Sequence, residues 1–465
     1  MVGGGVGGLA TAIRLRARGH HVTLFERLPT LGGKLAVRER EGFWFDIGPS
    51  LVTLPEVYDE LFRVAGTTLA DEVDLVRLDP QFTYAWRDGT RLVVTDQGCE
   101  APGYDRFVER GRRIWDVSVR TFFAGPMSGP LSLARRLRHL RDLTDIDPLR
   151  TLDAAARRTF DDPHLVQWAG RYATYSGSSP YAAPATLACI AHLERAFGCW
   201  YPMGGLGALC DAFVRVAERV GVDLRPGCDV RRITTTGDRV DGVELADGTR
   251  MRADVVVANA DATHLYRDLV PDARALATVR RARPSTSGFV VLAGVRGATP
   301  GITHHDIWFS DDEEREFSSI AAGRLADDPT IYACVSCVTD PTQAPVGHEN
   351  WFLLVNTPAG ITVDAPAYEA VVLERLAAHG VDLRDRLVFT ETITPDDLAA
   401  RYRSPGGAIY GTSSNGRRAA FVRPANRGAR RGLYLVGGSS HPGGGLPLVT
   451  MSARIVDRMI EADLR

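Results

Sequence analysis

Three glycines near the start of the chain have the spacing of a phosphate-binding turn. They are Gly3, Gly5 and Gly8, in the pattern G-x-G-x-x-G. In such a turn the first glycine permits a sharp bend, the second lets the backbone approach a pyrophosphate, and the third lets a helix pack closely on a strand. The N-terminus of the following helix then offers unpaired N–H groups to the phosphates. We predict that these glycines, with Val6 and Gly7 between them, bind a dinucleotide.

A helix and a strand follow these glycines in the order that a dinucleotide-binding βαβ unit requires. Apolar residues recur at helical spacing from Leu9 to Ala17. Residues 21–26 then form a β-branched and aromatic strand that ends at Glu26, 18 residues beyond Gly8. An acid about 20 residues after the glycines accepts a hydrogen bond from a ribose hydroxyl. A flexible glycine-rich terminus is the alternative, but it would make the helix and the strand coincidences.

The strand expected before Gly3 has only two residues, Met1 and Val2. Loss of a central parallel strand would leave backbone groups of both neighbouring strands unpaired. We therefore expect either a very short first strand or a chain start that has been placed too late in the sequence.

A second glycine cluster lies near the other end of the chain. Residues 432–438 form an apolar strand that ends in two glycines, and a helix is predicted from about 448 to 461. Backbone without side chains can lie against a flat ring, and the positive end of the helix dipole stabilises negative charge on that ring. Gly437, Gly438, Gly445 and Leu448 lie in this segment. A glycine-rich structural turn is the alternative.

Two shorter motifs follow the ribose acid. Arg27 precedes the run Gly32-Gly33-Lys34, and residues 42–50 form a short aromatic strand that enters a Gly-Pro turn. The glycine pair lets the backbone pass close to the bound dinucleotide a second time. Lys34 either meets a phosphate or faces water.

The run Gly-Gly-Lys, followed by Gly-Phe-x-Phe-Asp-x-Gly-Pro-Ser, resembles the bacterial-type phytoene desaturase family of FAD-dependent carotenoid oxidoreductases. Further motifs similar to that family follow in its order, at residues 177–185, 198–207 and 441–447. The last of these reads His-Pro-Gly-x-Gly-x-Pro. The resemblance covers nearly the whole chain, from Gly3 to Ile460.

The resemblance implies that FAD is the cofactor and that the two ends of the chain enclose it. The backbone of Val230 would contact the adenine, and Asn259 lies where a continuous valine strand of the buried type ends. The predicted FAD-binding residues are Gly3, Gly5, Val6, Gly7, Gly8, Glu26, Arg27, Gly32, Gly33, Lys34, Gly48, Pro49, Val230, Asn259, Gly437, Gly438, Gly445 and Leu448.

The expected fold class is α/β. It is a Rossmann-like FAD-binding domain of the amine-oxidase and GDP-dissociation-inhibitor (GDI) type, with a mixed-sheet substrate domain and a helical lobe. We expect the FAD-binding domain to comprise residues 1–80, 196–264 and 406–465. The substrate domain would comprise a hairpin at 81–100 and residues 265–405, and the lobe residues 101–195.

The implied activity is desaturation of a long apolar carotenoid similar to phytoene. The flavin would take hydride from one allylic carbon while the neighbouring carbon loses a proton, so the cofactor carries the difficult step. His441 is the catalytic candidate for accepting that proton, because imidazole titrates near neutrality. A hydrogen bond that fixes the loop is its alternative role. Leu448 stands where many members have a small residue, which favours a later, modified carotenoid as substrate, and quinone or oxygen would re-oxidise the flavin.

Other activities fit the same scaffold. A carotenoid isomerase, a carotenoid ketolase and a flavin amine oxidase are the enzymatic alternatives. An amine oxidase favours an aromatic pair beside the flavin, and the closing motif has none. A non-catalytic prenyl-lipid carrier that resembles a Rab GDP-dissociation inhibitor is the alternative from another class, and a flavin spectrum of the purified protein would exclude it.

The composition of the chain limits the kinds of partner and environment that we expect for it. The net charge of -2 gives no basis for nucleic-acid binding. No stretch approaches ~18 consecutive apolar residues, so no membrane-spanning helix is predicted. The seven cysteines are scattered, and we expect them to be thiols of a cytoplasmic protein.

One region is strongly basic. Residues 101–160 carry 12 arginines against 7 acidic residues. Within them, Leu133, Leu137 and Leu140 share one side of a basic amphipathic segment at 131–141, which suits an anionic membrane surface. A lobe that buries these leucines is the alternative. Because an oily substrate would come from a bilayer, we expect peripheral association with the cytoplasmic membrane.

No metal site is expected. Cys334 and Cys337 form a C-x-x-C within a predicted strand and have no second pair. His304 and His305 are adjacent, and neighbouring residues of a strand point to opposite faces.

Overall fold

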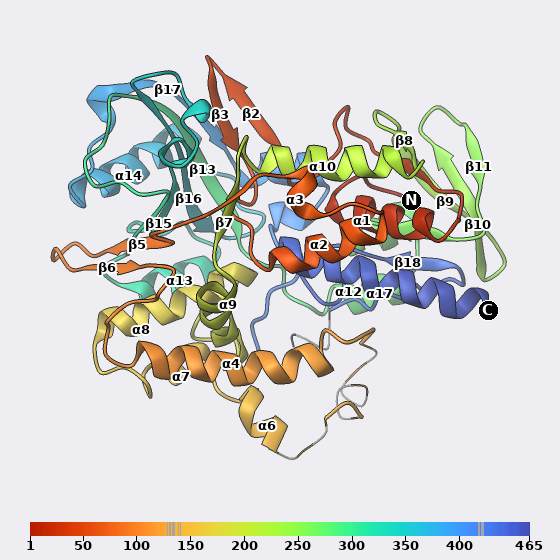
Figure 1. Cartoon of the computed structure of the whole chain (residues 1–465), viewed down its shortest axis with the longest axis horizontal. Coiled ribbons are helices and arrows are strands. Elements are labelled where there is room, and N and C mark those ends of the chain that lie inside the picture. Colours follow the sequence, from red (N-terminus) through yellow and green to blue (C-terminus); the bar gives the residue numbers. More distant parts are fainter. Residues whose placement is uncertain are drawn as a thin grey trace.

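The computed structural model of the chain describes residues 1–465 except 128, 130, 131, 133, 134, 138, 140, 417, 418 and 420–422. A parallel sheet with its helices, a mixed sheet and a helical lobe make up the molecule (Figure 1). The architecture is α/β, as predicted.

The parallel sheet is built on either side of Val2. This residue forms parallel bridges to Phe25 and Ala258, and its N–H donates to the Val257 carbonyl oxygen over 2.9 Å. The strands, from one edge to the other, are β8 (Asp223–Arg225), β1 (Thr23–Phe25), Val2 itself, β12 (Val256–Ala258) and β18 (Leu433–Leu435). The first strand is therefore present and very short.

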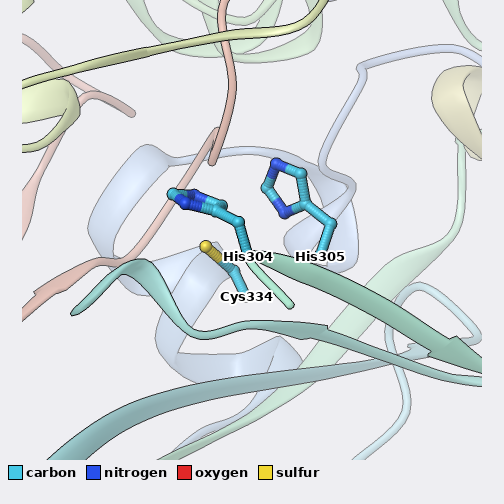
Figure 2. A group of neighbouring side chains, drawn as sticks. All are labelled: His304, His305 and Cys334. Carbon is cyan, nitrogen blue, oxygen red and sulfur yellow. The ribbon is translucent and has the colours of Figure 1, made fainter. Parts of the chain in front are cut away.

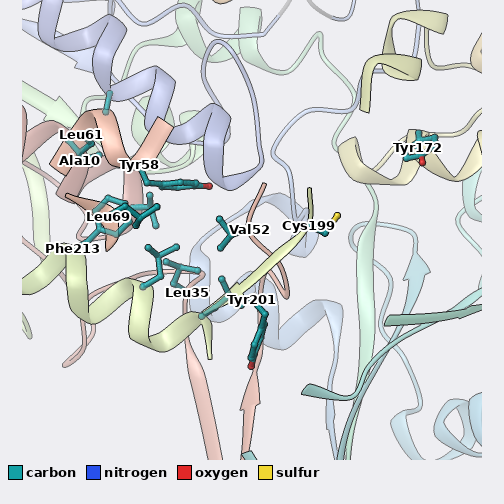
Figure 3. Close-up of a cluster of buried hydrophobic side chains, with 14 of the residues drawn as sticks. Ala10, Leu35, Val52, Tyr58, Leu61, Leu69, Tyr172, Cys199, Tyr201 and Phe213 are labelled. Carbon is teal, nitrogen blue, oxygen red and sulfur yellow. The ribbon is translucent and has the colours of Figure 1, made fainter. Parts of the chain in front are cut away.

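Helices cover this sheet (Figure 1). They are α1 (Val6–Ala17), α2 (Pro55–Val64), α3 (Leu69–Glu72), α10 (Leu206–Arg219) and α17 (Leu446–Leu464). α1 packs on α10, α17 and α2. It begins at Val6, and Gly7 and Gly8 belong to its first turn. Ala10, Tyr58 and Phe213 belong to the apolar core between these helices (Figure 3).

Smaller antiparallel units surround the parallel sheet. They are the hairpin β2 (Val37–Arg40) and β3 (Phe43–Asp46), the pair β4 (Leu75–Arg77) and β7 (Trp200–Pro202), and the sheet of β9 (Val230–Thr236), β10 (Arg239–Leu245) and β11 (Arg250–Arg252). The short helices α11 (Ala262–His264) and α12 (Ala273–Val279) follow β12.

The mixed sheet has seven strands. In spatial order they are β17 (Leu387–Ile393), β13 (Ser287–Arg296), β16 (His348–Thr357), β15 (Ile331–Cys334), β14 (His305–Trp308), β5 (Phe82–Ala85) and β6 (Arg91–Val94). Only β14 and β5 run parallel among these neighbours. Successive residues of β13 face opposite sides: Phe289 and Val291 pack under α14 (Ala365–Ala378), whereas Val290 faces a cavity. The helices α13 (Glu313–Ala321) and α15 (Pro395–Tyr402) also belong to this part of the chain.

The helical lobe lies beside both sheets (Figure 1). Its helices are α4 (Tyr104–Thr121), α6 (Arg141–Ile146), α7 (Leu152–Ala156), α8 (Pro163–Gly170) and α9 (Cys189–Phe197). α4 approaches α9 closely at Gly111, where a Cβ would lie 2.6 Å from the carbonyl oxygen of Ala188.

The basic character of the lobe is partly neutralised by ion pairs. Arg110 pairs with Asp147, and Arg120 pairs with Asp142. Of the predicted amphipathic segment, Leu133 and Leu140 lie outside the described residues. Among the helices that are described, none is both long and apolar enough to cross a bilayer.

His304 and His305 lie side by side, and the prediction that they point to opposite faces is wrong. Their ring centroids are 4.5 Å apart. β14 begins at His305, so His304 precedes the strand and strand alternation does not apply to it. Cys334 ends β15 in register with His305, while Cys337 lies in a 3₁₀ turn beyond that strand.

Candidate functional site

A cavity of about 770 Å³ has walls from the parallel sheet, the mixed sheet and the helical lobe. Gly3 and Gly5 from the N-terminal turn line it, as do Gly438 and Gly445 from the C-terminal cluster. The two ends of the chain pack against each other at this wall, since a Cβ on Gly7 would lie 3.0 Å from Val449 Cγ1. Residues that are far apart in sequence therefore form one surface.

The N-terminal turn has room for backbone only. Gly3 has φ +95°, and a Cβ there would lie 2.6 Å from the Asn259 carbonyl oxygen. A Cβ on Gly8 would collide with the Gly3 carbonyl oxygen. Gly5 precedes α1 and offers no capping side chain, so N–H groups of the first helical turn stay available beside the cavity that Val6 lines. With its amide oxygen turned toward the helix, Asn259 accepts from the N–H groups of Gly5 and Gly8, each over 3.2 Å.

Glu26 directly follows the strand β1, and its carboxylate is buried. Its Oε2 accepts from the Gly4 N–H over 2.7 Å, and its Oε1 accepts from the Leu28 N–H over 2.8 Å. A carboxylate has about four lone-pair directions, so it can still accept from a ribose hydroxyl. Gly33 packs on the glycine turn, where a Cβ would lie 3.0 Å from Gly5 Cα.

Lys34 lines the cavity and is half-buried. Its ammonium group donates to the Ile409 carbonyl oxygen and lies 5.5 Å from the Tyr402 ring centroid. Burial lowers the pKa of Lys34 to about 8, and the carboxylate of Asp261 opposes that shift. The side chain is thus a cation held at the wall, and its contact with a phosphate stays a prediction.

The C-terminal cluster places a helix start at the same cavity. α17 begins at Leu446, with Pro447 in its first turn, and Leu446, Pro447 and Leu448 line the cavity. Gly437 has φ +104°, and a Cβ there would lie 2.5 Å from the side-chain amide of Asn259. The positive end of the α17 dipole therefore points at a ligand in the cavity.

The rest of the cavity wall is largely apolar. From the mixed sheet come Val290, Ile307, Phe352 and Leu354, and from the helical lobe come Trp115, Phe122, Phe123, Leu187, Ile190 and Leu193. Such a wall suits a long apolar ligand that lies between sheet and lobe.

A model of the family described as flavin containing amine oxidoreductase matches residues 6–456. The chain belongs to this family. It is 34% identical to 4,4'-diapolycopene oxygenase of Methylomonas sp, over 100% of this chain and 98% of that protein. It is 32% identical to 4,4'-diaponeurosporene oxygenase of Staphylococcus aureus, over 99% of this chain and 97% of that protein. The predicted resemblance to FAD-dependent carotenoid oxidoreductases is confirmed, although these relatives are named oxygenases and not desaturases.

Solved structures share the fold of this family. An oxidoreductase from Methanosarcina mazei superposes with a TM-score of 0.68 at 16% identity, covering 99% of both chains. A putrescine oxidase bound to putrescine superposes with a TM-score of 0.68 at 16% identity, covering 100% of this chain and 98% of that one.

FAD is the cofactor of this flavin-containing family and of this chain. The cavity fits it: glycines stand where a Cβ would collide, a buried carboxylate lies next to the turn, and two helix starts point inward. Every predicted FAD-binding residue except Gly8 and Gly437 lines the cavity. Those two glycines lie behind the wall and permit the close packing of α1 and β18 on their neighbours. Direct contact of each lining residue with FAD stays a prediction.

His441 lies away from the cavity. Its buried ring packs edge-on against Phe122, with centroids 4.6 Å apart, and it is not a lining residue although Pro442 is. Burial lowers the pKa of His441 to about 4, and the backbone carbonyls of Phe122 and Gly125 raise it again. The position of the ring behind the wall favours the structural role over that of proton acceptor.

A polar cluster at the cavity was not among the predicted site residues. Arg171 lines the cavity and donates from Nη1 to Tyr84 Oη over 3.1 Å and to Tyr175 Oη over 3.2 Å. Tyr175 and Tyr172 in turn donate to the buried Glu194 carboxylate, the latter over 2.9 Å. The signal in the sequence is an arginine in a tyrosine-rich run, Arg-Tyr-Ala-Thr-Tyr, within an otherwise apolar region.

Proposed function

We propose that this FAD-dependent oxidoreductase oxidises a long acyclic carotenoid and introduces oxygen at its chain end. One observation carries the proposal: in a chain similar over its full length to two carotenoid oxygenases, the buried Arg171 lines a largely apolar cavity. The apolar walls suit a polyene, whereas the arginine suits an oxygen atom.

FAD, when bound, supplies the acceptor for electrons from the substrate. The side chains of Phe352, Leu354 and Ile190 would hold the polyene and exclude water from it. Arg171, with five N–H donors and a position fixed by two tyrosines, would donate to oxygen at the chain end. If the chain end is a methyl group, the balance would be R–CH3 + O2 giving R–CHO + H2O. Three C–H bonds become one C–H and one C=O bond, and O2 both takes the electrons and supplies the new oxygen atom.

Desaturation of a phytoene-like carotenoid is the second candidate. The motif at residues 441–447 favours it, because it resembles the closing motif of the phytoene desaturases. In that reaction the substrate loses two hydrogens and gains no oxygen, so a quinone could also accept the electrons.

We also propose that the substrate enters from a membrane surface at residues 146–149. Ile146 and Pro148 line the cavity, and the adjacent Leu149 is 65% exposed. An exposed leucine beside a cavity-lining segment suits insertion into the acyl boundary of a bilayer. The protein would then be a peripheral membrane enzyme.

Expression in cells that accumulate an acyclic carotenoid tests the reaction. Extracted pigments are separated and weighed by mass spectrometry, with cells that carry the Gly8→Ala variant as the control. A more polar product is expected, which has gained one oxygen and lost two hydrogens for each methyl group that is oxidised. A product lighter by two hydrogens without oxygen would establish desaturation instead, and a product of unchanged mass would establish isomerisation and end both proposals.

A further inference from the structure

A histidine pair and a cysteine lie together behind the wall of the cavity. Figure 2 shows His304 and His305 at the start of β14, with Cys334 on the neighbouring strand β15. One nitrogen of each ring and the Cys334 Sγ all lie within 4.8 Å of one another. The three side chains are buried, with at most 5% of each residue exposed.

One nitrogen of each ring is already engaged. His304 Nδ1 lies 2.7 Å from Thr339 Oγ1, and His305 Nδ1 lies 2.9 Å from Tyr332 Oη. Within the described part of the chain, Nε2 of both rings has no hydrogen-bond partner. Two orphaned ring nitrogens beside a thiol are unusual in a protein interior, where buried polar atoms are paired.

The hydrogen bonds at Nδ1 are those that a metal-binding histidine makes. If Nδ1–H donates to the hydroxyl oxygens of Thr339 and Tyr332, the lone pair of each Nε2 is left for an ion. Neutral imidazole is the form that binds a cation.

The charges around the cluster suit a cation of low charge. An ion that binds Cys334 Sγ would displace the thiol proton to solvent, because the thiolate is the form that binds a metal. Cu⁺ with one thiolate and two neutral imidazoles has no net charge. Zn²⁺ would leave one positive charge, with the carboxyl of Asp46 near Cys334 and the guanidinium of Arg171 near His305.

We propose that His304, His305 and Cys334 bind a soft transition-metal ion, Zn²⁺ or Cu⁺. Bonds of ~2.0–2.1 Å to nitrogen and ~2.3 Å to sulfur bring donor atoms to roughly 3.5 Å from one another, so small side-chain rotations close the site. Thiolate and imidazole together select these ions over Mg²⁺ and Ca²⁺. The ion would join β14 to β15. Through the hydrogen bond from His305 it would also hold Tyr332 in place, and Tyr332 lines the cavity and hydrogen-bonds to Ser50.

Metal titration of the FAD-loaded protein tests this site. The protein is stripped with a chelator and titrated with Zn²⁺ and Cu⁺, each in competition with a chromophoric chelator, and with Co²⁺ as an optical substitute for zinc. We expect one ion per chain, release of one proton per ion, and a thiolate-to-cobalt charge-transfer band in the difference spectrum. Of Zn²⁺ and Cu⁺, the ion that binds with the higher affinity is assigned as the occupant.

Single substitutions test which side chains bind the ion. Cys334→Ala should remove the charge-transfer band and weaken binding by more than the roughly 10–100-fold that loss of an outer hydrogen-bond partner costs. Thr339→Val should cost that smaller factor, and Cys337→Ala, which alters the other thiol of the C-x-x-C, should change neither readout. Flavin absorbance reports whether each variant is folded. Failure of the wild-type protein to bind either ion stoichiometrically would overturn the proposal without any variant, and so would unchanged affinity in folded Cys334→Ala.

Discussion

Gly7 and Gly437, from opposite ends of the chain, lie so close that a Cβ on Gly7 would stand 3.3 Å from Gly437 Cα. The contact joins the start of α1 to the end of β18, and Asn259 lies against both glycines. A redox ring held between the two termini thus depends on backbone packing as well as on polar groups.

Gly8→Ala should abolish FAD binding. The added methyl group meets the Gly3 carbonyl oxygen, which belongs to the turn itself and cannot move away. We expect a loss of about 1–3 kcal/mol in stability from the overlap, and a colourless protein. Flavin absorbance per chain and thermal unfolding measure the two effects.

Gly19→Ala is the matched control for that variant. Gly19 also has a positive φ of 93°, but nothing lies within 4 Å of its added Cβ. It should lose about 1–2 kcal/mol from backbone strain alone and keep its yellow colour. Equal flavin content in the two variants would contradict the role of the turn.

Stability should decrease as pH rises through neutrality, and Glu316 should account for part of the decrease. Burial raises the pKa of this carboxyl from 4.5 to about 7, although Thr330 donates to both of its oxygens. Its folded pKa is above its unfolded pKa, so its contribution is fully present below about pH 4.5 and is lost as pH rises through about 7. The difference amounts to about 3 kcal/mol.

Glu316→Gln should therefore flatten the pH dependence of unfolding between about pH 5 and about pH 8. Denaturant unfolding of the FAD-loaded protein at both pH values gives the free energies. Glu314→Gln, at an exposed position of the same helix, is the control and should leave the profile unchanged. If the free energy of unfolding of Glu316→Gln changed with pH as steeply as that of the wild type, other buried acids, such as Asp46, would account for the pH dependence.

The FAD-binding unit could be predicted because its determinants are local. Gly3, Gly5 and Gly8 are needed at fixed spacing by one turn, and the helix and strand after them follow from short-range patterns. The shortness of the first strand was visible in the sequence for the same reason.

The polar cluster and the histidine pair could not be predicted, because they depend on long-range packing. Arg171 meets Tyr84 only because the lobe docks on β5, and no spacing rule relates those positions. His304 and His305 share a side because β14 starts between them, and strand ends are set by the neighbouring strands.

Leu149→Asp should weaken membrane binding if the cavity opens toward a bilayer. The carboxylate would replace an exposed leucine next to the cavity-lining Pro148. Sedimentation with anionic vesicles should show less bound protein, at unchanged flavin content. Val346→Asp, at a fully exposed valine outside the lobe, is the control, and equal binding of both variants would contradict entry at this segment.

His441→Ala should keep FAD and leave the rate of flavin reduction by substrate unchanged. The side chain is buried against Phe122 away from the cavity, so its loss should lower only the melting temperature. His192→Ala, at a histidine that packs on Phe197 in the lobe, is the control for such packing loss. Anaerobic stopped-flow reduction of the flavin measures the rate, and a large decrease specific to His441→Ala would restore its role as proton acceptor.

Leu354→Trp should block the carotenoid while sparing the cofactor. Leu354 lies on β16 and lines the apolar wall from the mixed sheet, on the side opposite to α14. The indole would fill space that the polyene needs, so conversion should fall at least about tenfold, which corresponds to 1.4 kcal/mol of lost transition-state stabilisation. Flavin content should not change, because Leu354 does not belong to the glycine turns at which we expect FAD to bind. Leu354→Met, which nearly conserves volume, should retain activity. If Leu354→Trp converted carotenoid at the wild-type rate, the polyene would have to lie elsewhere, and the wall formed by sheet and lobe would not be the substrate site.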